Sequence, residues 1–351
     1  MRTFIRLLVI LVTTSIVASS LANAQGAPAA PGSFQQAREV HQRRSQSLFK
    51  NPRVVATGVG ISAAGKPVIK VYIESGSAAD IPAQADGIPV EVSVSGRIVA
   101  SRGACNNDNA DPEACRPDEP RAPPGSGGAR DRYPRPVPIG VSTGHTNITA
   151  GTIGCSVQVG CHTYALSNNH VFADEGAAAL GDDILQPGPY DGGTAPADVI
   201  GTLYDYEPIV FSTSASNIMD AALIATDSGT VGAATLGDGY GLPRKSPIDA
   251  VPDMDVMKYG RTTGFTSGTV DAIDALVNVG YDSGTARFVG QIIIRPGQFS
   301  AGGDSGSLIV VDGGADDRRP VGLLFAGSKT VTIANPIAPI LQRFGATIEG
   351  E

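Results

Sequence analysis

The stretch Gly302–Ser307 reads Gly-Gly-Asp-Ser-Gly-Ser, and it leads directly into an apolar run, Ser307–Val311. Glycines before a serine allow a tight backbone turn, although Gly-Asp-Ser-Gly also suits a plain hairpin turn. In such a turn the N–H groups of Gly303 and Ser305 would point at one spot, where they could stabilise an oxyanion. A serine hydroxyl is a weak nucleophile at neutral pH, so a catalytic Ser305 needs a histidine base and a carboxylate that orients it.

Two further segments supply these partners. His170 follows Ser-Asn-Asn at 167–169, and Asp220 precedes Ala-Ala-Leu-Ile at 221–224. The order along the chain is His, Asp, Ser, with gaps of 50 and 85 residues. A single histidine or aspartate is usually structural, but here each of the three residues adjoins a strand-like apolar run. Together they predict a catalytic triad, with Ser305 as nucleophile, His170 as general base and Asp220 as orienter.

The composition predicts an all-β protein with an ordinary hydrophobic core. Of 351 residues, 42% are hydrophobic and only 17% are charged, and the chain has 44 Gly and 25 Pro. Frequent turns and few long charged helices are typical of β folds. From Ile139 onward, short apolar runs alternate with Gly, Asp, Pro and Ser, which predicts a sandwich or a barrel. The expected strands include 164–167, 221–225, 291–295, 307–311 and 321–325.

Three segments carry helical signals. Residues 33–50 are polar and helical in character, and 78–85 is expected to form a short helix despite Pro82. A closing helix is expected at 335–344, because four apolar residues there recur at i, i+3, i+4 and i+7. These four residues are Ile337, Ile340, Leu341 and Phe344.

The chain is expected to divide into a small and a large unit. Two β-rich runs, 54–62 and 68–74, flank a Gly-containing turn and predict a hairpin, and 88–94 predicts a further strand. A small α+β unit is therefore expected over 25–100, as a propeptide, a folding helper or a fixed accessory domain. A Pro- and Gly-rich linker over 101–137 should connect it to the main domain, 138–351.

The N-terminus predicts export. Arg2 and Arg6 form a basic region, an apolar run follows over 7–17, and Ala22-Asn23-Ala24 is a small-x-small cleavage site. The apolar run is too short for a membrane anchor, which needs about 20 apolar residues. We therefore expect residues 1–24 to be a signal peptide and the mature protein to be secreted, either extracellular or periplasmic.

The net charge argues against two classes of partner. The net charge is −8, and it becomes −10 when Arg2 and Arg6 leave with the signal peptide. An acidic protein is poorly suited to bind nucleic acid or an anionic membrane. We expect a monomer that acts on a peptide or protein substrate and needs no cofactor.

Export makes the four cysteines candidates for disulfides. Three pairings are possible, and the short loops favour Cys105–Cys115 and Cys155–Cys161. A zinc site is the alternative, but no C-x-x-C spacing is present, so we expect no metal.

The three segments resemble the chymotrypsin-like (trypsin-fold) serine protease superfamily, and the bacterial trypsin-like and α-lytic-type peptidases most of all. The resemblance extends over roughly 139–345. Gly260–Val270, which reads Gly-Arg-Thr-Thr-Gly-Phe-Thr-Ser-Gly-Thr-Val, also looks like the segment that opens the second barrel in the bacterial enzymes. Asn168-Asn169 departs from the family, because animal-type members carry Ala-Ala before the histidine.

The resemblance implies a fold and further roles. It implies two antiparallel six-stranded β-barrels with a C-terminal helix, and a cleft between the barrels. Phe325, Ala326 and Gly327 would form the strand that pairs with the substrate backbone. Phe299 would lie at the base of the primary specificity pocket and favour a small or apolar residue before the cut, unless it is core packing.

Two other functions compete with a secreted serine endopeptidase. A catalytically silent peptide-binding pseudoprotease would have the same fold, although such proteins usually lose a triad member and all three stand here. An esterase of the α/β-hydrolase kind would need G-x-S-x-G around Ser305 and a different residue order, and the sequence has neither.

Overall fold

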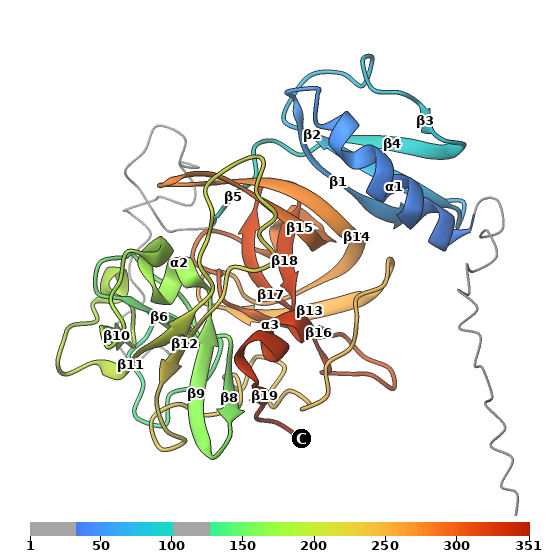
Figure 1. Cartoon of the computed structure of the whole chain (residues 1–351). Helices are drawn as coiled ribbons and strands as arrows, with labels where there is room; N and C mark the ends of the chain where they lie inside the picture. The colour runs from blue at the N-terminus through green and yellow to red at the C-terminus, as the bar shows by residue number, and fades with distance from the viewer. Residues whose placement is uncertain (1–32, 101–126) are drawn as a thin grey trace, which may run out of the picture.

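The computed structural model describes residues 33–100 and 127–351, which form two large β-sheets with few helices (Figure 1). The predicted all-β fold class with a small α+β region before it is confirmed. The expected signal peptide and most of the expected linker lie outside the described residues. Within the part of the chain described, no helix is long and apolar enough to cross a membrane.

The C-terminal half forms a closed ring of six strands. The ring runs β13, β16, β17, β18, β15 and β14, and β14 pairs back with β13. This is the second barrel that the resemblance implied, and the expected runs at 291–295, 307–311 and 321–325 lie in it. Its strands are β13 (Asp255–Gly260), β14 (Gly264–Tyr281), β15 (Gly284–Arg295), β16 (Leu308–Val311), β17 (Pro320–Gly327) and β18 (Thr332–Pro336).

The other half is a curled sheet that stays open. Its order is β19, β8, β9, β12, β11, β10, β6 and β7, and among the described residues no pairing joins β7 to β19. The first barrel therefore has two more strands than expected and no closing ladder. Its strands are β6 (Ser142–His145), β7 (Gly151–Thr152), β8 (Cys155–Val159), β9 (His162–Ser167), β10 (Asp183–Leu185), β11 (Val199–Tyr206), β12 (Ala222–Ala225) and β19 (Thr347–Ile348).

The predicted closing helix is confirmed as α3 (Ile337–Phe344). All four apolar residues of the expected face are buried in the core of the first half. The chain then crosses back to that half, where Thr347 of β19 pairs with Gln158 of β8. Two 3₁₀ turns, η1 (Asp174–Gly176) and η2 (Pro189–Asp191), lie in the loops of this half.

The N-terminal region packs one helix on a small sheet. The helix α1 (Phe34–Leu48) begins after Ser33, whose hydroxyl accepts a hydrogen bond from the N–H of Gln36 at 3.1 Å. The predicted hairpin is confirmed as β1 (Val54–Ile61) and β2 (Pro67–Ile73), with Gly65 at φ +72° in the turn. Beside β2 lie the parallel strand β4 (Ile88–Val94) and then β3 (Gln84–Ala85).

The helix expected at 78–85 is wrong. Residues 78–83 are bends and turns, and Gln84 and Ala85 form β3. Pro82 lacks a backbone N–H and disfavours the helical conformation of the residue before it. The apolar residues of this segment, Ile81 and Ala85, instead join the core under α1.

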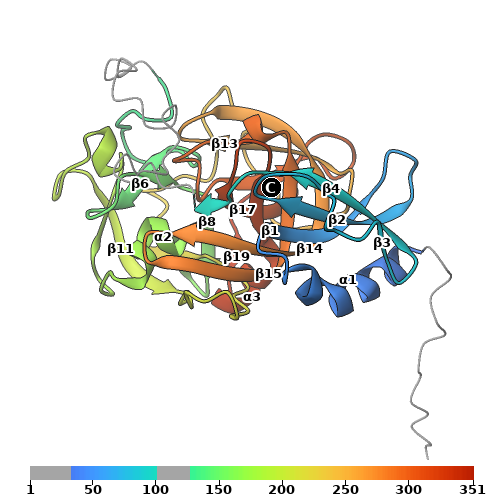
Figure 2. The same cartoon turned by 90° about the horizontal axis from the view of Figure 1, so that it is seen from above.

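The N-terminal sheet continues into the six-stranded ring. β1 pairs with β14, with Ala56 opposite Val277 and Thr57 opposite Leu276, and Figure 2 shows β1 and β14 side by side. Two ion pairs span the junction, Arg38–Asp274 at 2.5 Å and Lys70–Asp271 at 3.1 Å. A last short strand, β5 (Val99–Ala100), leaves the unit and reaches β14 and β17.

Candidate active site

His170 and Asp220 form a buried pair in the first half. His170 lies on the short helix α2 (Asn169–Phe172), which follows β9, and Asp220 precedes β12. Nδ1 of His170 lies 2.6 Å from Oδ2 of Asp220, and the backbone N–H of His170 donates to Oδ1 at 3.2 Å. A carboxylate can only accept, so the ring proton resides on Nδ1. Nε2 is buried and has no hydrogen-bond partner among the described residues, which leaves it able to take a proton.

The two asparagines before His170 tie its helix in place. The side-chain amide of Asn168 donates to the carbonyl of Asp220 at 2.8 Å. The amide of Asn169 donates to the carbonyl of Glu207 at 2.7 Å. Alanines in these positions would form neither bond. The departure from the animal-type Ala-Ala pattern therefore adds two side-chain hydrogen bonds around the His170–Asp220 pair.

Two side chains from the other half also hold Asp220. The hydroxyl of Tyr281, at the end of β14, donates to Oδ2 of Asp220 at 2.8 Å. Its ring meets the His170 ring edge-on, with centroids 6.0 Å apart. Oδ1 of Asn335 accepts from the backbone N–H of Asp220 at 3.0 Å. Sequence reasoning missed both residues, because no motif in the sequence connects them to Asp220.

Ser305 lies in a turn that requires glycine at positions 303 and 306. Gly303 and Gly306 have φ values of +95° and +96°, in the region that favours glycine. A Cβ on Gly306 would lie 2.2 Å from both the carbonyl of Thr152 and Oγ of Ser167, and a Cβ on Gly303 would crowd the Arg261 side chain at 2.5 Å. The tight turn expected before Ser305 is thus present, and a second glycine with positive φ follows the serine.

The carboxylate of Asp304 stabilises this turn through hydrogen bonds and an ion pair. Its carboxylate accepts from the N–H of Thr262 at 2.8 Å and from the hydroxyl of Thr263 at 2.7 Å. Nζ of Lys258 lies 3.5 Å from the same carboxylate, and both charged side chains are fully buried. Burial lowers the pKa of Lys258, and the charge of Asp304 opposes that shift. Thr262 and Thr263 belong to the segment that the sequence identified as the opening of the second barrel.

One strand of the first half lies between the His170 segment and the Ser305 segment. The N–H of Thr152 in β7 donates to the carbonyl of Ser305 at 2.8 Å, and its hydroxyl donates to the carbonyl of Gly303 at 2.9 Å. A Cβ on Gly151 would lie 2.5 Å from Val171, the neighbour of His170, and 3.1 Å from the Ser305 carbonyl. β7 therefore lies between the His170 helix and the Ser305 turn and contacts both.

The expected substrate strand runs beside Ser305. Oγ of Ser305 donates to the carbonyl of Phe325 at 3.3 Å. The Phe325 side chain is buried and packs on Phe288, with ring centroids 4.8 Å apart. Ala326 and Gly327 complete β17, and both are paired with β5.

Phe299 lies in the hydrophobic core of the ring. It ends the 3₁₀ turn η3 (Gly297–Phe299), is 1% exposed, and packs with Val256, Val270 and Ile294 inside the ring. These contacts favour the packing role that the sequence left open. Its role in specificity remains a prediction.

The predicted disulfide Cys155–Cys161 is wrong, since both thiols are free. Cys155 begins β8 and points into the core, where burial raises its pKa, whereas Cys161 is exposed in the turn after that strand. A strand rises about 3.3 Å per residue, so β8 holds the two cysteines farther apart than the ~7 Å Cα separation a disulfide tolerates. Cys105 and Cys115 lie outside the described residues.

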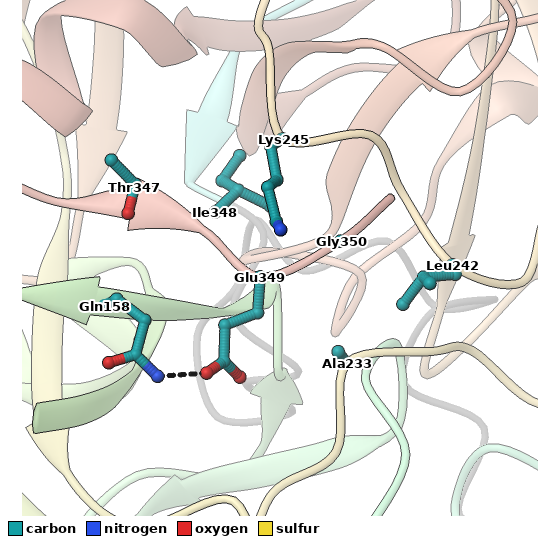
Figure 3. Close-up of a pocket in the computed structure, with 8 residues that line it drawn as sticks. All are labelled: Gln158, Ala233, Leu242, Lys245, Thr347, Ile348, Glu349 and Gly350. Carbon is teal, nitrogen blue, oxygen red and sulfur yellow. Dashed lines mark hydrogen bonds between the residues drawn. The ribbon is translucent and has the colours of Figure 1, made fainter.

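A pocket elsewhere in the molecule is not part of this site. Figure 3 shows it beside β8 and β19, and its volume is about 560 Å³. The side chain of Gln158 donates to the carboxylate of Glu349 within it, and no triad residue lines it. Among the described residues there is also no group of three or more His, Cys, Asp or Glu placed to hold a metal ion. The lining residues are Gln158, Ala233, Leu242, Lys245, Thr347, Ile348, Glu349 and Gly350.

Solved structures similar to this one are chymotrypsin-like bacterial serine proteases. A glutamic-acid-specific serine protease matches at 21% identity over 60% of this chain and 100% of that chain, with a TM-score of 0.43. Thermobifida fusca protease A matches at 21% identity over 61% of this chain and 100% of its own, with a TM-score of 0.44. Cellulomonas bogoriensis chymotrypsin matches at 20% identity over 61% and 99%, with a TM-score of 0.41.

A sequence comparison adds a second similarity. A family model described as the Nal1 C-terminal domain matches residues 211–334. This range contains Asp220, Ser305 and nearly all of the six-stranded ring, but not His170. No curated protein matches the sequence.

Proposed function

We propose that this chain is a serine endopeptidase that cleaves peptide bonds through an acyl-enzyme on Ser305. The observation that carries the proposal is the buried contact between Nδ1 of His170 and Oδ2 of Asp220 at 2.6 Å, which leaves Nε2 without a partner among the described residues. A histidine that is oriented in this way has one nitrogen committed to a carboxylate and the other ready to act as a base.

The proposed reaction needs only groups of this chain and water. Oγ of Ser305 attacks the substrate carbonyl carbon while Nε2 of His170 takes the hydroxyl proton. The N–H groups of Gly303 and Ser305 stabilise the oxyanion, and Asp220 stabilises the imidazolium. When the C–N bond breaks, His170 gives its proton to the leaving amine, and an ester on Ser305 remains. Water, deprotonated by His170, then hydrolyses the ester and restores the serine.

The proposal includes export of the enzyme. The basic, apolar and small-x-small segments over 1–24 support a signal peptide, and the mature protein would act on peptides or proteins in the periplasm or outside the cell.

A fluorophosphonate probe tests the proposal directly. The wild-type protein should form a covalent adduct that mass spectrometry locates on Ser305, and Ser305→Ala should form none. Ser307→Ala is the matched control, because Ser307 lies in the same turn but donates its hydroxyl to the carbonyl of Asp304. If Ser305 stays unlabelled after prolonged incubation both in the wild type and in Ile98→Asp, which disturbs the strand β5 beside β17, the enzyme is contradicted and the silent peptide-binding alternative is favoured.

A further inference from the structure

A short strand of the N-terminal region, β5, pairs with the edge of β17 (Figure 1). β5 runs antiparallel to β17, with Val99 opposite Gly327 and Ala100 opposite Ala326. The next residue of β17 is Phe325, whose carbonyl accepts from Oγ of Ser305. β5 therefore leads, pair by pair, toward the proposed nucleophile.

An extended peptide that reaches Ser305 would need this same edge of β17. β18 covers one side of Ala326 and Gly327, since both residues pair with it. On the other side, the backbone bonds to the chain before and within β16 end at Leu324, which bonds to Gly306 and Ser307, because the chain then turns away through Ser305. An extended peptide brought to Ser305 would therefore add as a strand to the open edge beyond Leu324. A strand edge pairs with one strand at a time, and β5 already occupies it.

Two side chains of the β5 segment are buried against the ring half. Ile98 is 1% exposed and Ala100 is 9% exposed, and both pack in one cluster with Phe288 and Phe325. Alternation along a strand turns Val99 to the opposite face, where it is only partly buried. The site thus accommodates a branched aliphatic side chain and, two residues later, a small one.

The rest of the N-terminal region holds β5 in position. β1 pairs with β14, and the N–H of Gly280 in β14 donates to the carbonyl of Ile98 at 3.0 Å. The hydroxyl of Thr330, in the ring half, donates to the carbonyl of Ser95 just before β5. A segment tethered this closely acts at an effective concentration on the order of millimolar, so a free peptide competes poorly with it.

We infer, on the basis of the proposed function, that Ile98–Ala100 is a tethered ligand of the substrate edge of β17. The peptides that replace it are extended and uncharged at this point, with a branched aliphatic residue followed two positions later by a small one. The N-terminal unit then closes the site in the intact chain, and substrate enters when β5 leaves.

The rate of labelling by the fluorophosphonate probe in the full chain tests this inference. Ile98→Asp places a charge in the apolar cluster and should release β5, so we expect labelling of Ser305 at least ten times faster than in the wild type. Val94→Asp is the matched control, because Val94 belongs to the same unit but its side chain is 53% exposed, and it should label at the wild-type rate. A peptide of sequence Ser-Gly-Arg-Ile-Val-Ala should slow labelling of Ile98→Asp again, and the same peptide with Asp in place of Ile should not.

The outcomes separate this inference from the proposed function. Equal rates in the wild type and Ile98→Asp would overturn the inference and leave the enzyme standing. Slower labelling of Ile98→Asp would also overturn it, because β5 would then support the β14–β15 hairpin that carries Tyr281. Absence of labelling in every variant would overturn the enzyme and the inference with it. If Ile98→Asp does not fold, Val99→Pro, which removes a strand N–H without adding charge, is judged by the same criterion.

Discussion

The two halves of the molecule hold the residues of the predicted triad in different ways. In the first, open half, side-chain hydrogen bonds hold His170 and Asp220, and the donor Tyr281 and acceptor Asn335 come from the other half. In the closed ring, Ser305 is held mainly by backbone shape, through two glycines with positive φ, and Thr152 of the other half adds hydrogen bonds to backbone carbonyls of the turn. The ring can supply a rigid turn because every strand in it has two neighbours. The open sheet depends on bonds that cross between the halves.

The largest expected effect comes from breaking the backbone turn. Gly306→Ala would place a Cβ 2.2 Å from the Thr152 carbonyl and force a side chain into positive φ. Strain and overlap of this kind cost on the order of 4 kcal/mol. If that cost falls on the Ser305 turn, labelling of Ser305 by the fluorophosphonate probe should slow by about 10³-fold.

Gly313→Ala is the matched control for the turn. Gly313 has φ +84°, and nothing lies within 4 Å of an added Cβ, so this variant has the conformational strain without the overlap. It should label at the wild-type rate. If the two variants label equally, the close approach of Gly306 to Thr152 does not determine the shape of the site.

A fall in pH should loosen the attachment of the N-terminal unit to the ring half. His41, on α1, has a pKa lowered from 6.5 to about 4, chiefly by burial, with the charge of Asp274 and the hydrogen bond to Thr57 opposing the shift. Between these values the unfolded chain binds a proton that the folded chain does not, so stability falls as the pH drops from about 6.5 to about 4. A fall in the pKa of His41 from 6.5 to about 4 corresponds to about 3 kcal/mol of unfolding free energy.

Amide hydrogen exchange of α1 and β1 measures this loss. Wild type and His41→Gln are compared at each pH, so that the intrinsic dependence of exchange on pH cancels. We expect protection in the wild type to fall relative to His41→Gln as the pH drops toward 4. Parallel behaviour of the two proteins would show that His41 is not the group that senses acid.

The smallest expected effect comes from removing one bond that crosses between the halves. Tyr281→Phe keeps the ring against His170 and removes the hydroxyl that donates to Asp220. A hydrogen bond to a charged group contributes about 1.5 kcal/mol, which corresponds to about tenfold in rate. The maximal labelling rate should fall by this factor, and the probe concentration for half-maximal rate should not change, because Tyr281 acts through Asp220. Tyr206→Phe, on the other half, should leave both parameters unchanged, and a change confined to probe affinity in Tyr281→Phe would contradict the positioning role.

Local patterns predicted the parts of the fold that local chemistry determines. The face of α3 and the β1–β2 turn follow from periodicity and from glycine, and the His, Asp and Ser segments follow from the demands of one reaction. The misread segments depend on distant partners. Ala85 is a strand residue because β4 lies beside it, and Cys155 cannot reach Cys161 because it lies in a core strand.

The features that the sequence did not predict are contacts between remote segments. Tyr281 meets Asp220 across 61 residues, and β5 is only two residues long, too short to carry a strand pattern of its own. Its place is set by the pairing of β1 with β14 and by the open edge of β17. Such contacts appear only when the whole sheet is assembled.

The central claim, that His170 and Asp220 act on Ser305 as one unit, is tested most directly by a double-mutant cycle. The rate of labelling of Ser305 is measured in His170→Ala, in Asp220→Ala and in the double variant. If Asp220 acts only through the His170 ring, the double variant should label no more slowly than His170→Ala alone. If the two losses multiply in the double variant, the residues act independently, and the account of the site is contradicted.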